Sequence, residues 1–91
     1  MTKLKIDERI LSYLEENGFE KQDLNSITPL YIKKYKGWYI CVNPAERPVV
    51  GSSREMKNFR NISYYDNLEK LKARLENLDE YIAICEERES D

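Results

Sequence analysis

Apolar side chains near the start of the sequence recur at helical spacing. Ile6, Ile10, Leu11, Tyr13 and Leu14 recur at the spacing of an amphipathic helix over residues 6–17. Gly18 follows immediately and suits the left-handed position that commonly ends a helix. The pattern therefore predicts a short N-terminal helix, and the chain from there to the next apolar run is expected to form a folded connector.

The clearest strand signal lies between Leu30 and Val42, where aromatic and β-branched residues are concentrated. Gly37 divides this run and reaches positive φ at little cost, as a tight turn requires. The pattern predicts a β-hairpin with strands near 30–35 and 38–43. A short third strand at Val49-Val50 would complete a small antiparallel sheet of two or three strands.

Residues 52–63 carry two conflicting signals. Ser52 to Glu55 fits a capping box, which would begin a short helix. The segment from Phe59 to Ser63 instead alternates between polar and apolar positions like a strand. The sequence leaves both interpretations open.

From Leu68 onward, apolar residues recur at spacings of three and four, and the segment contains neither Gly nor Pro. Asp66 is a suitable N-cap, so a single long helix over about residues 66–89 is predicted. The fold class is therefore α+β, with an N-terminal helix, a small antiparallel sheet built on the hairpin, and a long C-terminal helix. Residues 1–91 are expected to form a single compact domain, because this length supports one core but not two.

The residue types present exclude most catalytic schemes. The chain has no histidine, and its only cysteines, Cys41 and Cys85, stand among apolar neighbours, which favours buried, reduced thiols in a cytoplasmic protein. Acidic pairs such as Glu15-Glu16 cannot work as acid and base, because adjacent residues of a helix do not face each other. No apolar run approaches the length needed to cross a membrane. We expect no enzyme, no metal site and no cofactor.

Charge is divided unevenly along the chain, although the net charge is only −2. Residues 31–60 carry seven basic and two acidic side chains, whereas residues 61–91 carry four basic and nine acidic ones. A basic sheet with interleaved aromatic rings suits contact with phosphates and bases, so a nucleic-acid-binding domain is the alternative function. In the alternative without nucleic acid, the lysines only keep the sheet soluble and some of these cations pair with the acidic helix. The residues of the alternative are Lys33, Lys34, Lys36, Arg54, Lys57 and Arg60.

The apolar spacing of the C-terminal segment also resembles a short coiled-coil seam. A straight helix of this length measures about 36 Å and would extend past a compact core of this size, which invites a homodimer through this helix. A helix packed only on its own sheet explains the spacing equally well. The self-association residues would be Leu68, Leu71, Leu75, Leu78, Ile82 and Cys85.

The function favoured by these observations is a small non-enzymatic protein-interaction module that binds another protein. Tyr, Trp and Arg supply much of the binding energy at protein interfaces, and this chain has seven Tyr. Small, histidine-free, tyrosine-rich chains of this kind also fit accessory or inhibitory proteins of mobile genetic elements. This expectation rests on general resemblance in size and composition and not on a motif. The expected partner-binding residues are Tyr35, Trp38, Tyr39, Arg54, Arg60, Tyr64 and Tyr65.

Overall fold

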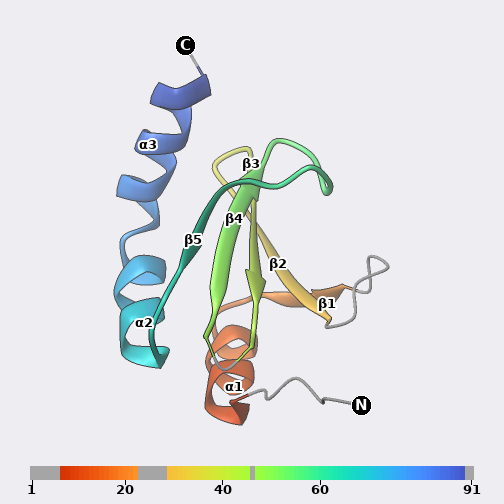
Figure 1. Cartoon of the computed structure of the whole chain (residues 1–91). Coiled ribbons are helices and arrows are strands. Elements are labelled where there is room, and N and C mark those ends of the chain that lie inside the picture. Colours follow the sequence, from red (N-terminus) through yellow and green to blue (C-terminus); the bar gives the residue numbers. More distant parts are fainter. Residues whose placement is uncertain (1–6, 23–28, 46, 90–91) are drawn as a thin grey trace.

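The computed structural model describes residues 7–22, 29–45 and 47–89 (Figure 1). Within these residues a five-stranded antiparallel sheet runs in the order of the sequence, each strand pairing with the next. One helix precedes the sheet and two follow it, so the α+β class is confirmed. The elements are α1 (Glu8–Glu16), β1 (Glu20–Gln22), β2 (Leu30–Tyr35), β3 (Trp38–Asn43), β4 (Val49–Ser53), β5 (Arg60–Tyr64), α2 (Leu68–Glu76) and α3 (Leu78–Glu89).

The central hairpin forms where the sequence predicts it. Strands β2 and β3 pair from Tyr31 with Val42 to Tyr35 with Trp38. Lys36 and Gly37 connect them, both with positive φ (49° and 82°), which matches the right-handed twist of a two-residue hairpin. The glycine adopts this conformation without strain, so the turn fixes the register of the pair.

The N-terminal helix is also confirmed, with closely similar bounds. Asp7 caps α1 by accepting a hydrogen bond from the Arg9 backbone N–H at 2.9 Å. Ile10 and Leu14 are fully buried, and Gly18 follows the helix with a φ of 84°. Ile6, the first residue of the predicted apolar face, lies outside the described residues.

The prediction of two or three strands undercounts the sheet. β5 is the strand interpretation of residues 52–63, and the competing helix start is wrong. The Ser53 hydroxyl accepts from the Glu55 N–H at 3.0 Å and donates to the Lys57 carbonyl at 2.7 Å, so it stabilises a bend after β4. The connector contains β1, whose polar residues pair with β2 through the backbone and give no apolar signal.

The single long C-terminal helix is wrong as predicted, because it breaks at Asn77 into α2 and α3. The Asn77 side chain donates to the Ala73 carbonyl at 3.0 Å, and its φ and ψ of −117° and 45° leave the helical region. An asparagine side chain competes in this way with helical backbone hydrogen bonds. The N-cap is Asn67 rather than Asp66, since the Asn67 side chain accepts from the Lys70 N–H at 3.0 Å.

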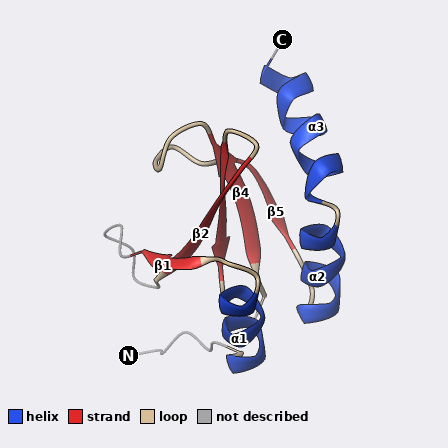
Figure 2. Ribbon diagram, turned by 180° about the vertical axis from the view of Figure 1, so that it is seen from behind, coloured by secondary structure: helices blue, strands red, loops and turns tan. Residues whose placement is uncertain are grey.

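All three helices contribute to one core on one face of the sheet (Figure 2). Strand residues that point to this face pack with the buried positions of α1, α2 and α3 in a single cluster. Side chains on both sides of the break at Asn77 are buried, so both C-terminal helices pack into this core. The buried core positions of α2 and α3 are Leu71, Leu75, Leu78, Tyr81, Ile82 and Cys85.

The opposite face of the sheet, called the open face below, carries none of the described helices. Side chains of neighbouring strand residues alternate between faces. Ile32 pairs with Cys41, and Cys41 pairs with Gly51, on this second face. Ile32 and Cys41 are buried, yet they stand outside the core cluster. The molecule therefore has one covered and one open sheet face.

We expect Leu71→Ala to lower the free energy of unfolding by about 2–5 kcal/mol, because it deletes a fully buried side chain that α2 presents to the sheet. Urea denaturation followed by circular dichroism measures the loss. The matched control is Lys70→Ala, which changes an exposed residue of the same helix and should stay within about 0.5 kcal/mol. Equal stabilities of the two variants would contradict the placement of α2.

Candidate partner-binding surface

The open face exposes large apolar side chains. Tyr64, Ile62 and Met56 are 67%, 51% and 37% exposed. Ile62 and Tyr64 lie two residues apart on β5, so both point to the open face. Met56 comes from the β4–β5 connection and lines a hollow of about 340 Å³ together with Ile32 and Tyr39. Met56, Ile62, Tyr64 and Tyr39 are called the open-face patch, and the side chains of Ile32 and Cys41 on the same face are buried.

Gly51 allows Ile62 to lie close to the sheet. A Cβ at Gly51 would come within 2.6 Å of the Ile62 Cδ1 and 3.3 Å of the Phe59 Cβ. The side chain of Ile62 therefore lies across the space that any other residue at position 51 would fill. The exposed half of Ile62 is held in place by the strand beneath it.

Two cations lie over the tyrosine rings of the open-face patch. The Lys34 Nζ is 5.7 Å from the centroid of the Tyr39 ring, and the Arg47 guanidinium is 5.8 Å from that of Tyr64. Arg47 also lies 3.8 Å from the Asp66 carboxylate. Contacts of this kind on an exposed surface are weak, about 0.5–1 kcal/mol, and leave the cations available to a partner.

The seven residues expected to bind a partner do not form one surface. Only Tyr39 and Tyr64 belong to the open-face patch. The Tyr35 hydroxyl donates to the Asp79 carboxylate at 2.7 Å, and the Tyr65 hydroxyl accepts from the Arg74 Nε at 3.1 Å, so both rings face the helices. Trp38 is buried in the core.

Arg54 joins the end of β4 to the end of α3. Its guanidinium lies 4.1 Å from the centroid of the Trp38 ring and donates two hydrogen bonds to the Glu89 carboxylate, at 2.9 and 2.8 Å. These bonds hold the pKa of Glu89 below its usual value. Ring and carboxylate together fix a long side chain that would otherwise sample many conformations.

A second hollow, of about 470 Å³, lies beside Arg54 and is called the arginine pocket. Arg60 from β5 and Arg88 from α3 line it, and the Arg88 guanidinium donates to the Asn61 side-chain oxygen at 2.9 Å. Residues lining the arginine pocket are Trp38, Ser53, Arg54, Glu55, Asn58, Arg60, Asn61, Cys85, Arg88 and Glu89.

The six cations of the nucleic-acid alternative are dispersed and partly neutralised. Lys36 forms an ion pair with Asp79, Arg54 with Glu89, and Lys57 with Glu55 at 3.9 Å. Lys33 lies over the Phe19 ring on the helix-covered side, whereas Lys34 points to the open face. Arg54 and Arg60 line the arginine pocket, and Lys33 and Lys34 line the separate hollow of about 340 Å³ beside Met56. The acidic α3 thus neutralises part of the basic hairpin.

The predicted self-association residues lie inside the molecule. Leu71, Leu75, Leu78, Ile82 and Cys85 are at most 8% exposed, and Leu68 is partly buried against the same core. Their spacing of three and four reflects packing on the chain's own sheet. The structure therefore does not present them to a second copy.

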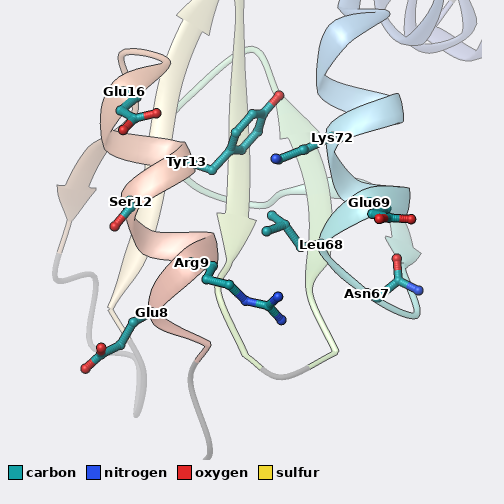
Figure 3. Close-up of a pocket in the computed structure, with 9 residues that line it drawn as sticks. All are labelled: Glu8, Arg9, Ser12, Tyr13, Glu16, Asn67, Leu68, Glu69 and Lys72. Atoms are coloured by element: carbon teal, nitrogen blue, oxygen red, sulfur yellow. The ribbon is translucent and has the colours of Figure 1, made fainter.

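A groove of about 890 Å³ separates α1 from α2 (Figure 3). Tyr13 and Leu68 extend into it, and the Lys72 Nζ lies 5.3 Å from the centroid of the Tyr13 ring. Glu8, Arg9, Glu16 and Glu69 surround these side chains. Arg9 is held by Asp7 at 2.8 Å. Charges of both signs line the groove, so it selects no ligand of one charge.

The sulfur atoms are sheltered. Cys41 and Cys85 are free and buried, and burial raises the pKa of the Cys41 thiol to about 11. The Cys85 Sγ lies 3.1 Å from the Ser52 Oγ and 3.4 Å from the Asn61 Nδ2, which donates to it. The described residues contain no cluster of three metal-ligating side chains, and none of the helices among them could cross a membrane.

Several surface residues were not anticipated from the sequence. Met56, Ile62 and Arg47 join Tyr39 and Tyr64 on or beside the open face, and Arg88 and Asn61 join Arg54 and Arg60 at the arginine pocket. The alternation of Ile62 and Tyr64 was a usable signal, since it places both on one face of a strand. Nothing in the sequence marks Arg88 as a neighbour of β5.

Comparisons of the chain with protein-family models, with curated proteins and with solved structures found no match, so its function is argued from its own residues.

We expect alkylation of Cys41 by iodoacetamide near pH 8 to be about two orders of magnitude slower in the folded protein than in urea-unfolded protein. At a pKa of about 11 only about one thiol in a thousand is ionised at this pH, whereas about one in four is ionised for an ordinary cysteine. Peptide mass spectrometry measures the rate at this residue. Equal rates would show a reactive, accessible thiol.

Proposed function

We propose that this protein is a small non-enzymatic module that binds another protein through the open-face patch. The observation that supports this is the exposure of Met56, Ile62 and Tyr64 on the sheet face that the described helices leave uncovered. Apolar side chains gathered on a surface commonly mark an interaction site. Tyr and Met are enriched at such interfaces, and the ring of Tyr64 offers contact area at little entropic cost.

The chemistry of the patch specifies a partner with an apolar centre and acidic groups around it. Lys34 and Arg47 stand over the two tyrosine rings and would meet those acidic groups. Like-charged partners are disfavoured by the same cations. A partner of this description differs from a second copy of the chain, whose own open face carries the same cations.

The compartment we propose is the cytoplasm, because two free, buried thiols suit a reducing environment. An accessory or inhibitory protein of a mobile genetic element would work in the proposed way, since covering a target's surface needs no catalytic group. Nucleic-acid binding is less well supported, because three of its six cations pair with the chain's own carboxylates.

The proposal predicts that a photo-crosslinking amino acid at position 64 captures one discrete protein in native cells. Position 64 is the most exposed apolar position of the patch, so a bound partner should lie within reach of the probe. The matched control places the same probe at Glu69, an exposed residue of α2 on the helix-covered side. Denaturing electrophoresis and mass spectrometry detect and identify the product.

Ile62→Asp should abolish this crosslink while changing the free energy of unfolding by less than about 1 kcal/mol, since Ile62 is half exposed. A product of twice the chain's mass would show self-association instead. A nuclease-sensitive product would favour nucleic acid. Equal capture from positions 64 and 69 would indicate non-specific contact, and each of these results contradicts the proposal.

A further prediction separates the two function classes. Electrophoretic mobility shift at low salt should show no complex with single-stranded or duplex DNA or RNA, because ion pairs within the molecule occupy Lys36, Arg54 and Lys57. Binding that falls steeply with added salt would support the nucleic-acid alternative. If a complex does form, Lys34→Gln is the variant to compare, because Lys34 is an open-face cation outside these ion pairs and its loss should weaken binding to nucleic acid.

A further inference from the structure

The arginine pocket is separate from the open-face patch and has its own chemistry. Three arginines from three parts of the chain line it: Arg54 after β4, Arg60 on β5 and Arg88 on α3. Its volume of about 470 Å³ lies in the range of small-molecule sites. Like-charged groups are placed together at a cost, which an anion between them would offset.

The three arginines differ in how they are held. Arg54 is fixed by the Trp38 ring and by two hydrogen bonds to Glu89. The ion pairs of the described residues include neither Arg60 nor Arg88. Arg88 donates one hydrogen bond to a neutral amide oxygen, that of Asn61, which orients it without cancelling its charge.

Two carboxylates, Glu55 and Glu89, also line the pocket and would repel an anion. Glu89 neutralises Arg54, and Glu55 lies 3.9 Å from Lys57 outside the pocket. The charges that these pairs leave in the pocket are those of Arg60 and Arg88. An anion of two charges would balance them, whereas a single carboxylate would leave one in excess.

The indole of Trp38 lies against the Arg54 guanidinium and carries a buried donor. Trp38 lines the pocket and is 5% exposed, and its Nε1–H has no hydrogen-bond partner among the described residues. A buried donor without a partner is costly, about 1–3 kcal/mol, and such groups deserve a physical explanation. This nitrogen is itself buried, so Trp38 contributes its ring beside Arg54 to the wall of the pocket and not a donor that a ligand can reach.

From these observations we propose that the arginine pocket binds the phosphate monoester of a small phosphorylated molecule, held by Arg60 and Arg88 against the wall that Arg54 and Trp38 form. A phosphate monoester carries nearly two negative charges at neutral pH and three strong acceptor oxygens. Planar guanidinium groups bind such oxygens in pairs. Asn58 lines the same pocket and would contact the part of the ligand that carries the phosphate.

Trp38 is the sole tryptophan of the chain and lines this pocket, so a ligand bound there should change the tryptophan emission. We expect a saturable change in emission when the full chain is titrated with ribose 5-phosphate, at constant ionic strength. Inorganic phosphate should bind more weakly, and ribose or acetate should produce no saturable change. Phosphorylated peptide and single-stranded oligonucleotide are titrated in parallel to distinguish a small ligand from a macromolecule.

Variants locate the site. Arg60→Gln with Arg88→Gln should weaken binding at least tenfold, because each removes a charge-assisted hydrogen bond. Arg9→Gln is the matched control, because Arg9 is an exposed arginine of α1 in the groove beside α2. This variant should bind ribose 5-phosphate as tightly as the unchanged chain does. Glu89→Gln should tighten binding several-fold, since it removes the carboxylate that competes for Arg54.

Four results would overturn the proposal: no saturable change with any phosphate, equal binding of acetate, binding that persists in the double arginine variant, or binding of the oligonucleotide or peptide alone. Ile62→Asp separates this proposal from the protein-binding one, because it alters the open-face patch and should leave the phosphate response unchanged. Either proposal can therefore fail while the other stands.

Discussion

The structure depends on the packing of two short helices along one face of a five-stranded sheet. The apolar side chains of α2 and α3 supply nearly half of the core, and they lie on both sides of the break at Asn77. Ile82 and Cys85, after the break, are buried in the same core as Leu71 and Leu75 before it. Burying a side chain of this size contributes about 1.5–3 kcal/mol, which is much more than one helical hydrogen bond lost at the break.

This packing also determines where the charges go. With α3 lying along the sheet, Asp79 reaches Lys36 and Tyr35 at the hairpin turn, and Glu89 reaches Arg54 after β4. The basic and acidic segments of the sequence are therefore partners of one another. The same helix brings Arg88 to Asn61, so Arg88 lines the arginine pocket together with Arg60 from β5.

Local signals in the sequence predicted local structure well. The aromatic run divided by Gly37 predicted both strands of the hairpin, and the spacing of Ile10 and Leu14 predicted α1. β1 could not be predicted, because a strand of Glu, Lys and Gln is held by backbone pairing that depends on β2. The break at Asn77 was hidden because the apolar spacing continues across it from Leu75 to Leu78.

The surfaces were harder to predict than the elements. Residue type alone suggested Tyr39, Tyr64 and Arg54, but it also suggested Trp38 and Tyr65, which face the helices. Which face a strand residue occupies depends on register, and the bulge between β4 and β5 shifts that register near Ser52. The meeting of Arg88 with β5 depends on tertiary packing between residues 27 positions apart.

Asn61 occupies the left-handed region, with a φ of 56°, at this bulge. Its side chain bonds to Ser52, Cys85 and Arg88, and its carbonyl accepts from the Tyr81 hydroxyl at 3.2 Å. Ile62, the next residue, lies on the other side of the sheet over Gly51. One peptide bond thus joins a residue of the arginine pocket to a residue of the open-face patch. A rotation of the backbone at Asn61 would therefore change the orientation of Ile62 towards a partner on the open face.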